Sequence, residues 1–301
     1  MTRFIHDQFA KDYLEELLKS YGEVIAPSRV AGEVREIDVL FVPSAQTTNI
    51  ETLGLLGKLA ARPAIFEPFR NPASVEEICD CLLKSLEVRG QLQREAKRNK
   101  TTLLKTKIPK LCVLTPTASP RLLRGFGAQQ GVDWVSGVYL MAEYLQTAIV
   151  VIHQLPPIPE TLWLRILGRG SVQNQAIDEL VALAPSHPNR QATLELLYTL
   201  KQNLVTTQNS QPQEDDRALV MRLAPLYQQD RELARQEGRA EGVHQERRLV
   251  VENLLRVRFG SIDTELSAIV EPLMALSPEE FTPLLLQRSR AELIAQFGHQ
   301  S

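Results

Sequence analysis

Every strong β-strand pattern in this sequence lies before residue 155, and this uneven distribution constrains the fold more than any other feature. Runs rich in β-branched and aromatic residues occur at 23–28, 33–43, 64–69, 111–114, 137–140 and 148–152. Stretches with helical periodicity stand before and between them, at 5–21, 51–61 and 74–98. This order predicts an α/β domain in which a mixed sheet is covered by helices.

Beyond residue 155 the strand patterns stop, and the sequence predicts an all-α half. Helices are expected at 161–183 and 191–204, followed by a polar linker at 206–216 and a long charged helix at 217–258. A run of short helices should end the chain, because Ser277-Pro278-Glu279-Glu280 is typical of a helix start. The predicted organisation is an α/β domain (1–155), a helical extension (156–205), a linker with the charged helix (206–248) and a small helical domain (249–301).

Composition excludes several classes of protein. A formal net charge of -2 gives the whole chain no strong bias toward nucleic acids or membranes, so any affinity for DNA must come from a local patch. The start lacks the apolar core of a secretory signal, and the longest apolar runs fall short of the ~20 residues that span a bilayer. We therefore expect no membrane partner, a cytoplasmic location and reduced thiols at Cys79, Cys81 and Cys112.

Two carboxylates interrupt the predicted strands. Asp38 lies within the apolar run 37–42, and Glu67 stands between Phe66 and Pro68. Burying an isolated carboxylate costs several kcal/mol unless a cation, water or a proton compensates it. Because the two acids fall in neighbouring strands, we predict that they share one site at an edge of the sheet.

The order of these features resembles a known family. A helix, then a strand with an Asp, then a strand with Glu-x-Lys is the signature of the PD-(D/E)XK nuclease superfamily. The opening Ile5-His6-Asp7-Gln8-Phe9-Ala10-Lys11 resembles the start of its recombination-promoting (Rpn, transposase-like) branch. The segment 249–297, with Arg258-Phe259-Gly260 in its middle, resembles a small C-terminal domain of unknown function often found behind such domains.

The resemblance implies a restriction-endonuclease-like fold and a metal-dependent DNA endonuclease that hydrolyses phosphodiester bonds. Asp38 and Glu67 would be ligands of Mg²⁺ or Mn²⁺, with Asp7 as a third candidate. The alternatives are that Asp38 and Glu67 form ion pairs with Arg29, Arg35 or Arg70, and that Asp7 caps the first helix.

One position departs from the family pattern. Phe69 stands where the superfamily has Lys and Rpn-like relatives have Gln. The missing polar group would have to come from Arg70, our candidate third catalytic residue, or from Lys84 on the next helix. The site is therefore either active with a relocated cation or degenerate. In the second case the chain would be a non-catalytic interaction protein that retains the fold and forms homo-oligomers through its long charged helix.

A basic stretch follows the proposed site. Residues 89–110 contain eight Lys or Arg and one acid, Glu95. Lys97, Arg98 and Lys100 are the candidate contacts to DNA phosphates. A solvated charged face is the alternative, and the lack of an interleaved aromatic residue argues against stacking on single-stranded bases.

Overall fold

The computed structural model describes residues 2–26, 28–30, 35–44, 49–206 and 214–298, which form two compact units. Unit 1 comprises Met1–Ala224 and unit 2 comprises Pro225–Ser301. The divisions predicted at residues 155 and 205 lie inside unit 1, and the one predicted at residue 248 lies inside unit 2.

Unit 1 is built on a seven-stranded mixed sheet in the order β1-β4-β5-β6-β9-β8-β7. The central strands β5, β6 and β9 run parallel, and the other neighbours pair antiparallel. The strands of this sheet are β1 (Gly22–Ile25), β4 (Val39–Pro43), β5 (Ala64–Pro68), β6 (Lys110–Thr115), β7 (Gln129–Gln130), β8 (Val138–Leu140) and β9 (Thr147–Val151). A separate two-stranded sheet pairs β2 (Ser28–Val30) with β3 (Arg35–Ile37).

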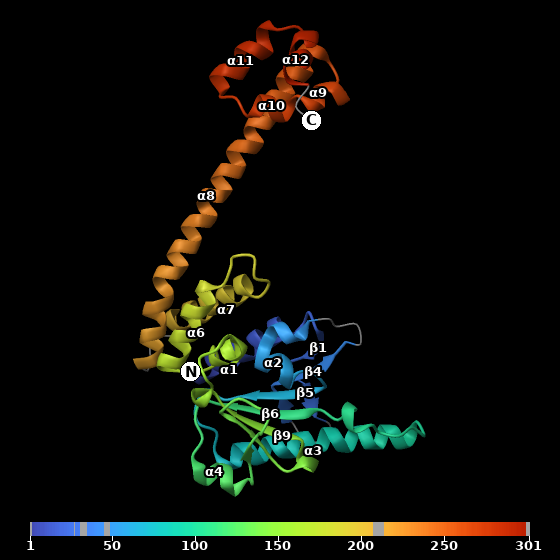
Figure 1. The fold of residues 1–301 in the computed structure, drawn as a ribbon, viewed down its shortest axis with the longest axis vertical. Coiled ribbons are helices and arrows are strands. Elements are labelled where there is room, and N and C mark those ends of the chain that lie inside the picture. Colours follow the sequence, from blue (N-terminus) through green and yellow to red (C-terminus); the bar gives the residue numbers. More distant parts are fainter. Residues whose placement is uncertain (1, 27, 31–34, 45–48, 207–213, 299–301) are drawn as a thin grey trace. The chain divides into compact units, whose positions relative to one another are not determined.

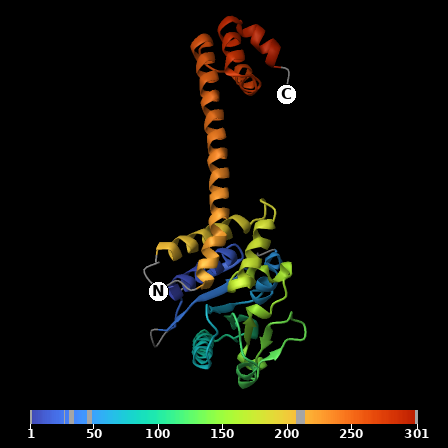
Figure 2. The same cartoon turned by 90° about the vertical axis from the view of Figure 1, so that its left-hand side faces the viewer.

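Helices cover both faces of the sheet, as parallel central strands require. All five residues of β5 and all five of β9 are buried. Helix α1 (Thr2–Leu18) lies on one face, where it buries Tyr13 and Leu17, and α3 (Val75–Arg98) lies on the other (Figures 1 and 2). The mixed, helix-flanked sheet predicted from the sequence is thereby confirmed.

One predicted strand proves to be two. The chain bends at Asp38, so β3 pairs with β2 in the small sheet, whereas β4 pairs with β1 and β5 in the large one. Periodicity along a chain cannot show such a change, because a strand's side-chain pattern is independent of its hydrogen-bonding partners. Residues 33 and 34 of the predicted strand lie outside the described part of the chain.

The remaining elements are helical beyond β9, as predicted. Helix α7 (Arg190–Thr206) packs against α1, and α8 (Glu214–Phe259) is the long charged helix. Val251 and Leu255 of α8 are buried in the core of unit 2 together with Leu273 and Phe281. The other helices are α2 (Gly54–Leu59), α4 (Pro120–Gly125), α5 (Leu162–Arg165), α6 (Gly170–Ala182), α9 (Thr264–Ala268), α10 (Val270–Met274), α11 (Pro278–Gln287) and α12 (Arg290–Phe297).

None of the helices in the described ranges is long and apolar enough to cross a membrane.

Candidate functional site

Asp38 and Glu67 meet because of the register between β4 and β5. Val39 pairs with Phe66 in this antiparallel ladder, so Asp38, one residue earlier, comes opposite Glu67, one residue later. The backbone N–H of Asp38 donates a hydrogen bond to Oε1 of Glu67 at 3.4 Å. The predicted convergence of the two acids is therefore present in the fold.

Two lysines from opposite helices reach these acids. Nζ of Lys11, on α1, lies 2.8 Å from Oδ1 of Asp38. Nζ of Lys84, on α3, lies 2.8 Å from Oε2 of Glu67. Lys84 thus brings a cation to Glu67 from a neighbouring element, although the family pattern places its lysine two residues after the glutamate. Lys11 was not among the residues predicted for the site.

These four residues line one open pocket with a volume of about 230 Å³. Its lining contains more acidic than basic side chains, so the lining has a negative formal charge. The lining residues are Asp7, Lys11, Asp38, Glu67, Pro68, Phe69, Glu77, Asp80, Cys81 and Lys84. We call it the acidic pocket.

Burial and charge make Glu67 unusual. Its side chain is 2% exposed, and this desolvation, together with the nearby Asp38 carboxylate, raises the pKa of Glu67 to about 6. The ammonium of Lys84 opposes the rise without cancelling it. Burial by itself would lower the pKa of Lys84, but the Glu67 carboxylate outweighs it and raises that pKa, so Lys84 stays protonated. Near pH 6, Glu67 can thus gain or lose a proton.

Cys81 completes the buried side of the acidic pocket and was not predicted as a site residue. Its thiol donates to Oε2 of Glu67 at 3.7 Å, and burial followed by the Glu67 charge raises the pKa of the thiol. Cys81 and Lys84 are three residues apart on α3, so one helix face directs both toward Glu67. The spacing can be read from the sequence, but only the packing of α3 on the sheet shows that this helix face lies next to Glu67.

Arg70 points to a different cluster. Its guanidinium donates to the carbonyl oxygen of Gly168 and to Oδ1 of Asp216, each at 3.0 Å. Nε2 of His6 lies 2.8 Å from the same Asp216 oxygen. Arg70 does not line the acidic pocket. Because Asp216 lies in the first turn of α8, the Arg70 side chain instead holds that turn against the rest of unit 1.

Two alternatives were left open for these acids: that Asp7 caps the first helix, and that Asp38 and Glu67 pair with arginines. Asp7 lies more than a turn inside α1, which begins at Thr2, so the prediction that it caps this helix is wrong. Asp7 instead lines the acidic pocket. The side chains of Arg29 and Arg35 lie outside the described part of the structure.

The donor set of the acidic pocket suits a hard cation. Among the described residues, no group of three or more His, Cys, Asp or Glu is arranged to hold a metal ion. Two converging carboxylates match the way Mg²⁺ is often bound, through one or two protein oxygens while it keeps several waters. After burial, the Asp38 charge is the next contribution to the raised pKa of Glu67, and each of the two carboxylates already has a lysine ammonium 2.8 Å away.

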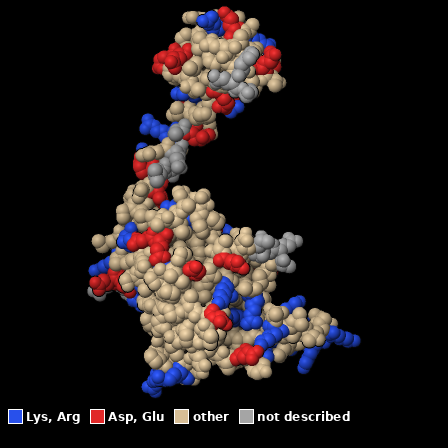
Figure 3. Space-filling model, in the orientation of Figure 1, with Lys and Arg blue, Asp and Glu red and all other residues tan. Residues whose placement is uncertain are grey.

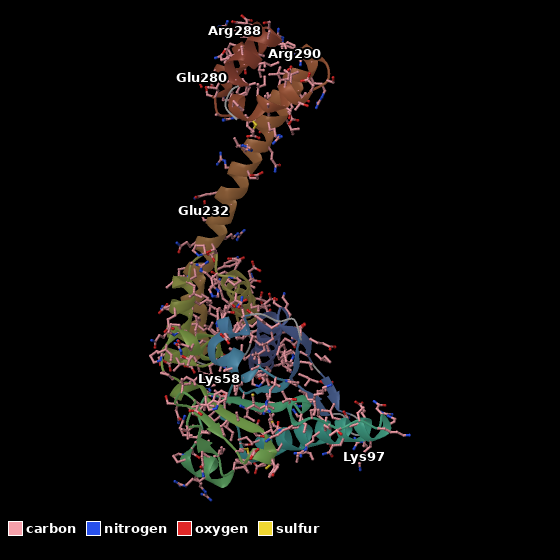
Figure 4. The ribbon with its side chains drawn as sticks, turned by 45° about the vertical axis from the view of Figure 1, so that its right-hand side comes forward. Lys58, Lys97, Glu232, Glu280, Arg288 and Arg290 are labelled. Atoms are coloured by element: carbon pink, nitrogen blue, oxygen red, sulfur yellow. The ribbon has the colours of Figure 1, made fainter. Side chains whose placement is uncertain are left out.

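The predicted phosphate contacts lie together at the outer end of α3. Lys97 and Arg98 stand in its last turn and Lys100 follows, all three exposed. Figure 3 shows basic side chains gathered at this end of α3, and Figure 4 labels Lys97 there. Other basic residues of the stretch have partners within the chain. Lys105 pairs with Glu143, Arg89 donates to the carbonyl of Tyr144, and Lys110 lies over the ring of Trp134.

None of the protein families, curated proteins or solved structures with which the chain was compared matches it.

Proposed function

We propose that unit 1 is a metal-dependent phosphodiesterase acting on DNA, with its site in the acidic pocket. The observation that carries the proposal is the approach of Asp38 and Glu67 across β4 and β5 with the Lys84 ammonium 2.8 Å from Glu67. Two carboxylates with a lysine beside one of them are similar to the charge pattern that the resemblance to PD-(D/E)XK nucleases implies, although here the lysine comes from α3 and not from the strand that carries Glu67.

In this proposal each residue of the chain has a distinct task. Asp38 and Glu67 provide oxygens for Mg²⁺ or Mn²⁺, and a bound ion of this kind polarises a phosphate and lowers the pKa of water. Lys84 supplies positive charge beside Glu67, where it would offset charge that develops on the phosphate. Its position compensates for Phe69, which has no polar group.

Contacts to the nucleic acid would come from the basic end of α3. Lys97, Arg98 and Lys100 are exposed and carry the positive charge that a DNA backbone attracts, in a chain whose net charge is otherwise slightly negative. Such contacts position a duplex without reading its sequence.

The test combines metal binding with cleavage. We expect Mn²⁺ to bind the protein, followed by calorimetry, and to support nicking of a supercoiled plasmid. Asp38→Asn and Glu67→Gln should weaken both together, because each removes a ligand charge while keeping the shape. Lys84→Met should abolish nicking and leave Mn²⁺ binding intact or tighter, since it removes a competing cation.

Glu76→Gln is the matched control for the acid substitutions, because Glu76 is exposed at the start of α3 and does not line the acidic pocket. Absence of Mn²⁺ binding to the wild-type protein would exclude the proposal.

A second candidate function has its own support. Both acids already have lysine partners at 2.8 Å, and such internal neutralisation is typical of structural ion-pair networks. On this alternative the chain is an interaction protein that retains the fold without catalysis. It predicts that Asp38→Asn melts at the same temperature with and without Mn²⁺, as does the wild type.

A further inference from the structure

Three basic side chains from separate segments of unit 1 gather around Trp134. Nζ of Lys58, on α2, lies 4.2 Å from the centroid of the Trp134 ring, and Nζ of Lys110, on β6, lies 4.4 Å from it (Lys58 is labelled in Figure 4). The backbone N–H of Lys110 donates to the carbonyl oxygen of Pro63 at 2.8 Å, which brings the neighbouring Arg62 close enough for its charge to act on the Lys110 ammonium. We call Lys58, Arg62 and Lys110 the Trp134 cluster.

The loop before β8 fixes where the ring lies. A Cβ at Gly131 would come 2.5 Å from Cδ1 of Trp134, so a side chain there would displace the indole. The same loop holds Lys58, because the carbonyl oxygen of Asp133 accepts a hydrogen bond from its ammonium at 2.5 Å. The fold therefore brings the ring and its lysines together.

Like charges are concentrated in the Trp134 cluster. Within the described ranges, none of its three side chains forms an ion pair with an acid. The face of an indole ring attracts an ammonium but leaves its charge in place. Lys110 is half-buried; burial is the main cause of the lowered pKa of its ammonium, and the charges of Arg62 and Lys58 lower it further. An anion bound among the three would relieve this repulsion.

The nearest acids line a neighbouring pocket. Lys58 is the one basic residue in the lining of an open pocket of about 530 Å³, which also carries three acids, Glu51, Asp133 and Glu160. None of these carboxylates is among the charges that shift the pKa of Lys110, and neither Arg62 nor Lys110 lines that pocket. An anion would therefore be held chiefly by Arg62 and Lys110, away from these carboxylates.

The Trp134 cluster is separate from the acidic pocket. Lys110 pairs with Ala64, the first residue of β5, whereas Glu67 lies near the end of that strand. None of the three basic residues lines the acidic pocket. A ligand of the cluster would thus occupy a second site, at the opposite end of β5.

We propose that the Trp134 cluster binds a terminal phosphate group, either inorganic phosphate or a phosphomonoester. A terminal phosphate carries a charge of about −1.5 to −2 at pH 7, which suits three neighbouring cations better than the single charge of a phosphodiester. The guanidinium of Arg62 can donate to two phosphate oxygens, and the ammonium groups donate to the others. This inference does not depend on the phosphodiesterase activity proposed above.

Inorganic phosphate, titrated into the full-length chain, tests the proposal by calorimetry and by tryptophan fluorescence. Phosphate draws the ammonium groups off the ring, so the emission of Trp134 should change; the chain's other tryptophan, Trp163, is 3% exposed and lies outside the cluster. Arg62→Gln and Lys110→Met should each weaken binding by about tenfold, as expected for the loss of a hydrogen bond to a charged group. Lys107→Met, at an exposed lysine three residues before Lys110, is the matched control and should bind as the wild type does.

Trp134→Phe separates the optical signal from the binding. This variant should lose the fluorescence change and keep a calorimetric affinity close to that of the wild type, because phenylalanine retains an aromatic face. Adenosine 5′-monophosphate and a duplex with a 5′-phosphate are titrated in parallel, and tighter binding of either would support the proposal and identify the source of the phosphate group. Three results would overturn it: no binding of phosphate, a fluorescence change that potassium chloride of equal ionic strength reproduces, or unchanged affinity in both Arg62→Gln and Lys110→Met.

Discussion

At the scale of single residues, Glu67 is the most sensitive position in unit 1. It is buried beside a like charge, and three groups donate hydrogen bonds to its oxygens: the backbone N–H of Asp38, the ammonium of Lys84 and the thiol of Cys81. The protonation of such a carboxylate depends on its burial and on the charges around it. Its titration can therefore be used as a probe of the acidic pocket.

The raised pKa makes stability depend on pH in a predictable direction. The pKa of Glu67 rises from 4.5 to about 6 on folding, so the folded state holds the proton more tightly. The stability that this proton contributes is complete below pH ~4.5 and is lost as the pH rises through ~6. Between pH 4.5 and 7.5 the free energy of unfolding of the wild type should fall by about 1–2 kcal/mol more than that of Glu67→Gln, because a glutamine at this position does not titrate.

Urea unfolding of the two proteins at both pH values measures this difference. Equal losses in wild type and Glu67→Gln would mean that Glu67 ionises normally, in which case neither its burial nor the Asp38 charge would perturb its pKa. Glu76→Gln again serves as the control, because Glu76 is exposed and lies outside the acidic pocket.

At the scale of elements, α3 joins two parts of the proposed function. Its first turns carry Cys81 and Lys84 to the acidic pocket, and its last turn carries Lys97 and Arg98. A capping box between Ser74 and Glu77 fixes where the helix begins. Since a helix is stiff, that one anchor sets the distance from the pocket to the basic end.

The basic end of α3 should govern how DNA binding responds to salt. Replacing Lys97, Arg98 and Lys100 by Ala should weaken binding uniformly across sequences and lower the salt slope by about one unit for each phosphate that is no longer neutralised. Fluorescence anisotropy with a labelled duplex over a range of salt concentrations measures the slope. Replacing Arg121 and Arg124 on α4, which are also exposed, is the matched control. An unchanged slope would identify the basic end as solvated surface.

At the scale of the whole molecule, unit 1 depends on helices that follow its sheet in sequence. The hydroxyl of Tyr13 in α1 donates to the carbonyl of Trp163, and α7 packs against α1 with Leu194 and Leu197 buried. The first turn of α8 adds the buried pairs of Asp216 with His6 and Arg70. Segments 156–206 and 214–224 therefore cover one side of α1.

This arrangement predicts where the chain can be divided. A fragment of residues 1–224 should unfold in one cooperative transition. A fragment of residues 1–155, which the strand pattern alone suggested as an independent unit, should be molten or insoluble because it exposes the covered side of α1. Thermal denaturation followed by near-ultraviolet circular dichroism separates these outcomes. A sharp transition in the shorter fragment would show that the later helices are dispensable.

The sequence by itself determined where most helices and strands lie and that the strand patterns end before residue 155, although it did not predict β2, β7 or α4. Apolar periodicity and chain punctuation are local, so the runs at 64–69, 111–114 and 148–152 became β5, β6 and β9 almost residue for residue. It also identified Asp38 and Glu67, because the cost of burying a charge can be seen from neighbouring residues alone.

Only the tertiary structure decided what those acids meet. The β4–β5 register brought them together, and the packing of α1 and α3 delivered Lys11 and Lys84, while Arg70, next to the motif in sequence, pairs with Asp216 146 residues away. The bend at Asp38 and the single unit formed by 1–224 have the same origin. Partners are chosen by three-dimensional packing between distant segments, and local pattern contains no information about that choice.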